Sequence, residues 1–271
     1  ATFASEVMPD SVSAAELERR FGGLARLYGV AGAARIRQSH VAVIGIGGVG
    51  SWAAEALARS GVGQITLVDM DHVAESNINR QIHALTDTVG QSKVLAMRDR
   101  IAQIHPTCVV HCVDDFATPE NWPLLLPQPV DAVLDACDQI KAKTAIAAWA
   151  RANATLHIAV GAAGGKRHAH KVDVDDLAHT THDPLLAQLR YRMRKFHGAP
   201  REGKKMGVTC VFSREAVAGP DASCNIEGDG SLNCHGYGSV VAVTATFGQC
   251  AAGWILDQLA IGRGNAEKTT L

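Results

Sequence analysis

The feature that most constrains the fold is the run VAVIGIGGVG at residues 41–50, which is followed by the helix-like segment SWAAEALARS. Its first four residues are apolar, which is typical of a strand buried on both faces of a sheet. Gly45, Gly47 and Gly50 then fit the pattern G-x-G-x-x-G where the strand gives way to a helix. Such a turn lets a phosphate approach the backbone and presents the amide groups of the helix start to it. We therefore predict a nucleotide-binding turn, with a glycine turn used only for packing as the alternative.

Strand-like and helix-like segments alternate after this turn. This alternation predicts an α/β fold, a Rossmann-like doubly wound and mainly parallel sheet with a C-terminal extension. We expect an N-terminal helical arm at residues 1–38, a nucleotide-binding core at residues 39–165 and a C-terminal part of the same domain at residues 166–271. The strand-like segments are QITLVD (64–69), CVVHCVDDF (108–116), VDAVLDACD (130–138), TLHIAVG (155–161), KRHAHKVDVDDL (166–177) and GVTCVFSRE (207–215).

Composition excludes several classes of protein. The net charge of −1 gives no nucleic-acid signature for the whole chain, and seven cysteines without a C-x-x-C pair argue against a disulfide framework or a zinc clip. The first ten residues lack the basic and apolar regions of a secretory signal, so we expect a cytoplasmic protein. The apolar stretch at residues 240–256 is short for a membrane span and is diluted by Thr and Gly. We expect a core helix there and no transmembrane span, with peripheral membrane association as the alternative.

Polar residues after the second strand indicate the kind of nucleotide. Asp69 ends that strand about 20 residues past the glycines, where a carboxylate can accept the ribose hydroxyls, although a turn acid is the alternative. Arg80 and Lys93 add positive charge to a site where backbone amides already serve a pyrophosphate, which suggests a triphosphate. Either residue alone would more simply form a surface ion pair. The predicted ATP-binding residues here are Asn77, Arg80, Gln81 and Lys93.

Two acidic residues, Asp135 and Asp138, follow the fourth strand-like segment. The spacing D-x-x-D cannot put both on one strand face, so we expect them to have different roles. Because Mg²⁺ bound with phosphate oxygens needs only one or two protein carboxylates, we assign Asp138 to Mg²⁺, with a helix-capping acid as the alternative.

A basic segment lies at residues 190–205, within a helix-like stretch and the loop after it. It carries seven Lys or Arg residues against one acid, Glu202. A solvated helix face is one interpretation, and contact with a polyanion such as tRNA is the other. The basic residues are Arg190, Arg192, Arg194, Lys195, Arg201, Lys204 and Lys205.

The motifs G-I-G-G-V-G, V-D-M-D, S-N-I-N-R-Q, G-Q-S-K and D-A-C-D resemble, in order and spacing, the adenylating enzymes related to the ubiquitin activators. Over a longer part of the chain, RFGGLARLYG, NRQIHAL, HDPL and VTCVFSREA are similar to the bacterial tRNA threonylcarbamoyladenosine dehydratases. This resemblance implies a homodimer that uses ATP and Mg²⁺ to adenylate the carboxylate of threonylcarbamoyl-adenosine in tRNA. A nitrogen of the substrate's own urea would then close a ring, with loss of AMP.

The resemblance also implies individual roles. Gly45, Gly47 and Gly48 would line the phosphates, and Arg80, Lys93 and Asp138 would form the catalytic set. A cysteine-desulfurase or sulfur-acceptor system is a partner implied by the resemblance alone.

Two departures from the sulfur-carrier branch bear on the assignment. Arg20-Phe21 is followed by Gly22-Gly23 instead of a second arginine, so the role of an arginine acting across the dimer is empty or moves to Arg26. The paired C-x-x-C motifs are absent, and the role of Cys234 stays open. The alternative functions are an adenylyltransferase for a ubiquitin-like sulfur carrier, an NAD-dependent dehydrogenase and a non-catalytic nucleotide-binding scaffold.

Overall fold

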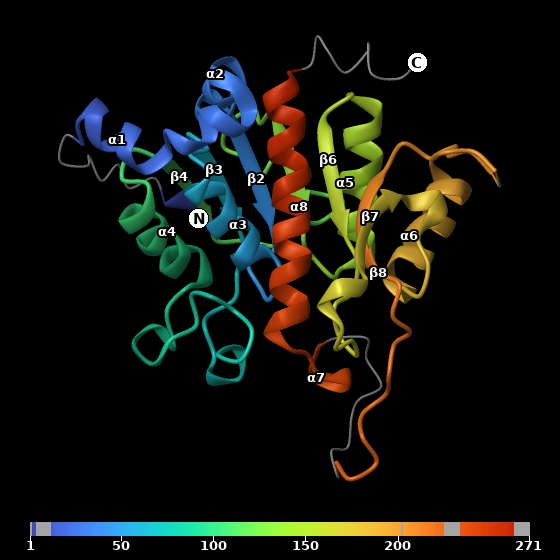
Figure 1. Cartoon of the computed structure of the whole chain (residues 1–271). Helices are drawn as coiled ribbons and strands as arrows, with labels where there is room; N and C mark the ends of the chain where they lie inside the picture. The colour runs from blue at the N-terminus through green and yellow to red at the C-terminus, as the bar shows by residue number, and fades with distance from the viewer. Residues whose placement is uncertain (1, 4–11, 202, 225–233, 263–271) are drawn as a thin grey trace.

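The protein is built on one eight-stranded sheet with the strand order β1-β4-β3-β2-β5-β6-β8-β7 (Figure 1). The structure is a computed structural model that describes residues 2–3, 12–201, 203–224 and 234–262. The six central strands are parallel, and β1 and β7 pair antiparallel at the two edges. The predicted α/β fold with a mainly parallel sheet is therefore confirmed. The strands are β1 (Thr2–Phe3), β2 (His40–Ile44), β3 (Gln64–Val68), β4 (Val109–Val113), β5 (Ala132–Asp135), β6 (Leu156–Val160), β7 (Val172–Asp176) and β8 (Thr209–Ser213).

Helices cover both faces of the sheet. Alternate residues of β2 point to opposite faces, so Val41 and Val43 pack with α3, α4 and α8, whereas Ala42 and Ile44 pack with α5. Figure 1 shows α8 crossing in front of the sheet and α5 behind it. The helices are α1 (Ala14–Phe21), α2 (Gly23–Gln38), α3 (Gly50–Arg59), α4 (Lys93–Ile104), α5 (Ile140–Ala152), α6 (Pro184–Phe196), α7 (Cys234–Tyr237) and α8 (Val241–Ile261).

The apolar helix α8 is a core helix, as predicted. It packs on α2, α3 and the strands from β5 to β8. A Cβ atom at Gly248 would stand 2.6 Å from the carbonyl oxygen of Val49, so the small residue allows α8 to approach the start of α3. None of the described helices is both long and apolar enough to cross a membrane.

The N-terminal helices differ in detail from the prediction. Ser13 and Glu16 form a capping box at the start of α1, and Gly22 separates α1 from α2 within the predicted helical arm. A second break, at Gly29 with φ of +77°, was not predicted, and neither was β1.

Candidate nucleotide-binding site

The glycine turn between β2 and α3 has room for a ligand at one glycine and none at two others. Gly45 has φ of +85°, and a Cβ there would stand 2.9 Å from the carbonyl oxygen of Ala136. A Cβ at Gly50 would overlap the carbonyl oxygen of Gly45. At Gly47, by contrast, the nearest atom to a Cβ would be Nε2 of Gln81 at 3.8 Å. The turn therefore requires Gly45 and Gly50 for its own fold and leaves open space at Gly47.

This difference predicts separate effects for two substitutions. Gly47→Ala should keep the melting temperature and weaken ATP binding, because the added methyl group occupies space that the chain leaves open. Gly50→Ala should lower the free energy of unfolding by about 1–3 kcal/mol, as overpacking commonly does. Thermal denaturation and calorimetric titration with ATP measure the two effects, and an equal loss of melting temperature in both variants would contradict this account of the turn.

The carboxylate of Asp69 fastens the turn to the end of β3. It accepts hydrogen bonds from the backbone N–H groups of Ile46 at 2.7 Å and Asp71 at 2.8 Å, and the residue is only 5% exposed. Burial raises the pKa of Asp69, although both hydrogen bonds oppose that shift. Each carboxylate oxygen can accept more than one hydrogen bond, so a ribose remains compatible with this geometry. The ribose role stays a prediction.

Arg80 and Gln81 lie against the glycine turn. A Cβ at Gly48 would meet Cγ of Arg80 at 3.4 Å, and Nη1 of Arg80 donates to the carbonyl of Ser76 and to Oδ1 of Asn79. These two hydrogen bonds hold a guanidinium group whose residue is 8% exposed and leave its other donors for a ligand. Oε1 of Gln81 is buried and has no partner among the described residues. An unpartnered buried amide beside a phosphate-type turn suits a bound nucleotide.

Lys93 and Asn77 approach the same region from the segment after β3. Lys93 is the first residue of α4, and its Nζ lies 3.2 Å from Oδ2 of Asp71. Oδ1 of Asn77 accepts the N–H of Ala74, so this side chain shapes the turn that carries Arg80. The structure brings Lys93 to Asp71, beside Asp69, and Arg80 to Gly48, and the contact of each with phosphate stays a prediction.

The two acids after β5 occupy different environments. Asp135 is fully buried and pairs with Nζ of Lys143 at 3.0 Å. Asp138 is exposed and accepts a hydrogen bond from Nε2 of Gln139 at 3.3 Å. Its loop adjoins the glycine turn, because a Cβ at Gly45 would lie 3.2 Å from the backbone nitrogen of Cys137.

Asp138 suits a metal that is held mainly by the nucleotide. No group of three or more His, Cys, Asp or Glu side chains within the described ranges could hold a metal by itself. A single exposed carboxylate beside a phosphate turn fits Mg²⁺, which keeps several waters and takes oxygen ligands from phosphates.

Lys143 was missed in the sequence, although a signal was available. It shares one face of α5 with the buried residues Ile146, Ala147 and Ala150, at the spacing of successive helical turns. A lysine on such a face indicates a buried ion pair. Lys166, which follows β6 and is 2% exposed, was also missed, and we find no pattern in the sequence that indicates its burial.

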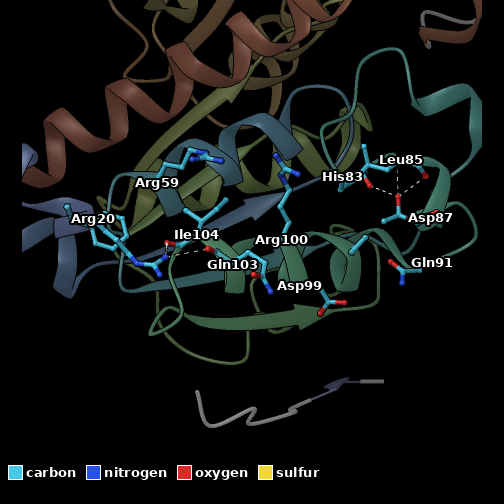
Figure 2. Close-up of a pocket in the computed structure, with 13 residues that line it drawn as sticks. Arg20, Arg59, His83, Leu85, Asp87, Gln91, Asp99, Arg100, Gln103 and Ile104 are labelled. Carbon is cyan, nitrogen blue, oxygen red and sulfur yellow. Dashed lines mark hydrogen bonds between the residues drawn. The ribbon is translucent and has the colours of Figure 1, made fainter. Parts of the chain in front are cut away.

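A cavity of about 710 Å³ lies beside α4, away from the glycine turn (Figure 2). His83 stands between the two, with Nε2 2.8 Å from the carbonyl oxygen of Ile46, and burial lowers its pKa to about 4. Arg20 lines the cavity, and its Nη1 donates to the carbonyl oxygens of Gln103 and Ile104. Arg20 and Arg26 are both exposed, and Arg26 makes no hydrogen bond of this kind with the described residues.

The basic segment contains residues that form hydrogen bonds with other parts of the chain and residues that face solvent. Arg190, Arg192 and Arg194 are half-buried and donate, respectively, to Thr180, Thr144 and Pro200. The residues that face solvent are Lys195, Arg201, Lys204 and Lys205.

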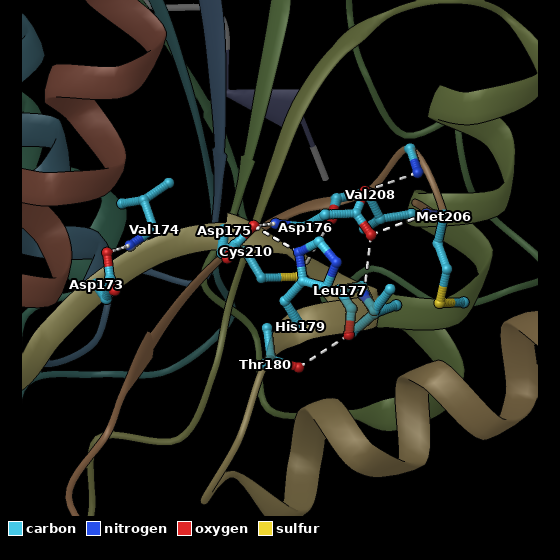
Figure 3. A network of polar contacts seen from close by, with 12 residues as sticks. Asp173, Val174, Asp175, Asp176, Leu177, His179, Thr180, Met206, Val208 and Cys210 are labelled. Carbon is cyan, nitrogen blue, oxygen red and sulfur yellow. Dashed lines mark hydrogen bonds and ion pairs between the residues drawn. The ribbon is translucent and has the colours of Figure 1, made fainter. Parts of the chain in front are cut away.

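Asp176 anchors the loop that carries Lys204 and Lys205. Its carboxylate accepts the N–H groups of Met206 and Gly207, both at 2.8 Å, in the network of Figure 3. The end of this loop is therefore fixed to β7. The side chain of Cys234 lies outside the described residues.

Comparisons with known proteins agree with this geometry. The family model described as the ThiF family matches residues 19–268. The tRNA threonylcarbamoyladenosine dehydratase of Escherichia coli strain K12 is 45% identical over 250 residues, which cover 89% of this chain and 93% of that protein. The enzyme of the same name from Haemophilus influenzae is 41% identical over 244 residues, covering 89% and 94%.

Solved structures give the same result. The crystal structure of the E. coli dehydratase TcdA in complex with ATP has a TM-score of 0.83 and 42% identity, covering 96% of this chain and all of that one. The Drosophila sechellia adenylyltransferase and sulfurtransferase MOCS3 is 36% identical over only 42% of this chain and 25% of that protein, so the sulfur-carrier alternative is not favoured. With the glycine turn, the basic groups around it and similarity along nearly the whole chain, this protein belongs to the ThiF family, in the branch of the tRNA threonylcarbamoyladenosine dehydratases.

Proposed function

We propose that this protein catalyses the ATP-dependent cyclising dehydration of threonylcarbamoyl-adenosine in tRNA. The observation that carries the proposal is the packing of Arg80 and Gln81 against Gly48 and Gly47, with Lys93 nearby, in a chain that is similar to named dehydratases over most of its length. An NAD-dependent dehydrogenase would have no use for this concentration of positive charge beside the phosphate turn.

The chemistry has two steps. The carboxylate of the substrate attacks the α-phosphorus of ATP, and pyrophosphate leaves. A nitrogen of the urea group then attacks the activated carbonyl carbon, the bond from that carbon to the AMP oxygen breaks, and AMP leaves. The oxygen of the lost water therefore departs with AMP.

The chain's own residues would stabilise the first step. Fixed positive groups aimed at the charge that develops on the departing pyrophosphate lower the barrier, because they need no reorganisation during the reaction. We assign this role to Arg80 and Lys93, and the backbone amides of the glycine turn to the phosphates. Asp138 would hold Mg²⁺, which when bound supplies charge neutralisation on the phosphate oxygens.

One experiment tests the function directly. The protein is incubated with ATP, Mg²⁺ and tRNA that carries threonylcarbamoyl-adenosine, and the nucleosides are analysed by mass spectrometry. A nucleoside lighter by one water, formed only with ATP, is the expected product. An unchanged nucleoside after stoichiometric incubation would overturn the proposal.

We also propose that the basic segment binds the tRNA backbone through its exposed members. Changing Lys195, Arg201, Lys204 and Lys205 together to Gln should raise the Kd for tRNA. The slope of log Kd against log salt should fall by about 0.7–0.9 for each phosphate that the variant no longer neutralises, because each neutralised phosphate releases counterions. ATP affinity should stay unchanged, since these side chains lie outside the glycine turn.

The matched control carries the same change of charge elsewhere on the surface, at Arg19, Arg37, Arg59 and Lys141. Filter binding over a series of salt concentrations measures both variants. If the two lose tRNA affinity equally, the basic segment has no special role and tRNA docks elsewhere.

Further features of the proposal concern assembly and location. We propose a homodimer, supported by the apolar side chains of Leu27 and Val30 on α2, which are 74% and 80% exposed beside Arg26. Arg26 would then be the candidate for an arginine acting across the dimer. A cytoplasmic location, peripheral membrane association and a cysteine-desulfurase or sulfur-acceptor partner are proposals that rest on sequence and resemblance alone.

A further inference from the structure

A buried lysine joins three chain segments at the carboxyl edge of the sheet. Nζ of Lys166 donates to the carbonyl oxygens of His182 at 2.9 Å and Ser213 at 3.3 Å, and the residue is 2% exposed. Burial lowers the pKa of Lys166, and Asp183 and Glu215 oppose that shift. The first of these segments follows β6, the second precedes α6 and the third is the end of β8. A buried charge at a junction of loops fixes their relative positions.

The residue that this junction presents to solvent is His182. Its backbone has φ of +56°, a left-handed conformation that is uncommon outside glycine and that clusters at functional sites. The carbonyl is held by Lys166, and the next residue, Asp183, accepts the N–H groups of Ala162 and Leu186 with its buried carboxylate. The backbone on both sides of the imidazole is thus fastened to buried groups.

One of the two ring nitrogens of His182 is free to accept a proton. Nδ1 lies 3.0 Å from Oγ1 of Thr181, and Nε2 has no hydrogen-bond partner in the part of the chain that the structure describes. When Nδ1–H donates to Thr181, the lone pair is on Nε2. The residue is exposed, so Nε2 is available to a substrate.

His182 lies on the side of the nucleotide site where the acyl group of the substrate belongs. β2, β5 and β6 are successive parallel neighbours, so the carboxyl end of β6 is about two strand spacings, roughly 10 Å, from the glycine turn. Asp183 lies directly against Gly161, the residue after β6, because a Cβ there would overlap its carboxylate. A triphosphate on the glycine turn leaves the edge above β5 and β6 for the group that it activates.

We propose that His182 is the general base of ring closure, an inference that rests on the proposed function. The urea nitrogen forms a bond to the activated carbonyl carbon while its proton passes to Nε2 of His182. The bond from that carbon to the phosphate oxygen breaks, and AMP leaves with the bonding electrons. Lys166 is the positioning residue that holds the imidazole in place.

The test separates the two steps of the reaction. His182→Asn removes the base, and Asn tolerates the left-handed backbone. Exchange of labelled pyrophosphate into ATP, which reports adenylation, should stay close to the parent rate. Ring closure should fall by roughly 10²–10⁴-fold, the usual contribution of a general base, and AMP should appear with uncyclised nucleoside as the intermediate hydrolyses.

The positioning role of Lys166 is tested by combining a change at Lys166 with the change at His182. Lys166→Met should show the same division between intact exchange and slow ring closure, and adding it to His182→Asn should slow ring closure no further. His179→Asn is the matched control, because it removes a nearby exposed imidazole that pairs with Asp175, and it should cyclise at the parent rate.

Two results would overturn the assignment of His182. They are ring closure at the parent rate in His182→Asn, and loss of pyrophosphate exchange together with ring closure, which would place the residue in binding or adenylation. A parent protein that leaves threonylcarbamoyl-adenosine unchanged in the presence of ATP would instead overturn the proposed function.

Discussion

Arg80→Ala and Lys93→Ala are each expected to lower the rate of AMP formation by roughly 10²–10³-fold, the usual cost of losing one preorganised electrostatic group. Arg80 is preorganised because hydrogen bonds to Ser76 and Asn79 hold it against Gly48. Asp138→Ala should lose turnover as well, because Asp138 is the carboxylate proposed to hold Mg²⁺. Single-turnover assays of AMP release measure the effect.

Controls separate catalysis from folding. Arg80→Lys keeps the charge and loses the planar guanidinium fork, so its rate should fall between those of Ala and the parent. Arg37→Ala, at an exposed residue paired with Glu18, should have the parent rate. Circular dichroism should be the same in all variants. Near-parent turnover in any of the three site variants would remove that residue from the catalytic set.

Lys143→Met is expected to lower the free energy of unfolding by about 3–5 kcal/mol, the cost of leaving one member of a buried ion pair unpaired. Both members of this pair are fully buried. Desolvation is the largest influence and lowers the pKa of Lys143, but the attraction and hydrogen bond of Asp135, together with Cys137 and Cys210, offset it and the net shift is upward. Urea denaturation measures the loss of stability.

A double variant distinguishes the loss of the ion pair from a simple loss of packing. Lys143→Met combined with Asp135→Leu should recover part of the loss, because no uncompensated charge remains in the core. Arg214→Met, which breaks an exposed pair with Asp173, should change stability little. If the double variant is no more stable than Lys143→Met, the unpaired charge of Asp135 is not the cause of the lost stability.

The parallel core of the sheet could be predicted because each element carries its own signal. The apolar run of β2 and the glycine turn follow one another within ten residues, and aspartates mark the ends of β3 and β5. The helix-like segment after the glycine turn is α3, and the apolar stretch after Val240 is α8. Local patterns of this kind need no knowledge of the tertiary structure.

Features that depend on distant partners could not be predicted. β1 is two residues long, and it is a strand only because it pairs with β4, more than 100 residues later. The extended character of β7 was predicted, but its antiparallel direction depends on β8. The basic segment looks uniform in sequence, yet Arg190 turns inward because acceptors at Leu177 and Thr180 lie within reach.

The acidic edge of the sheet has a consequence for how copies of this protein meet. β7 ends the sheet and carries Asp173, Asp175 and Asp176 within five residues. An open edge invites strand addition and aggregation, and closely spaced like charges oppose it because a second copy would bring its own carboxylates alongside. Growth of the sheet past β7 is therefore disfavoured, which leaves the helical faces for the homodimer that we propose.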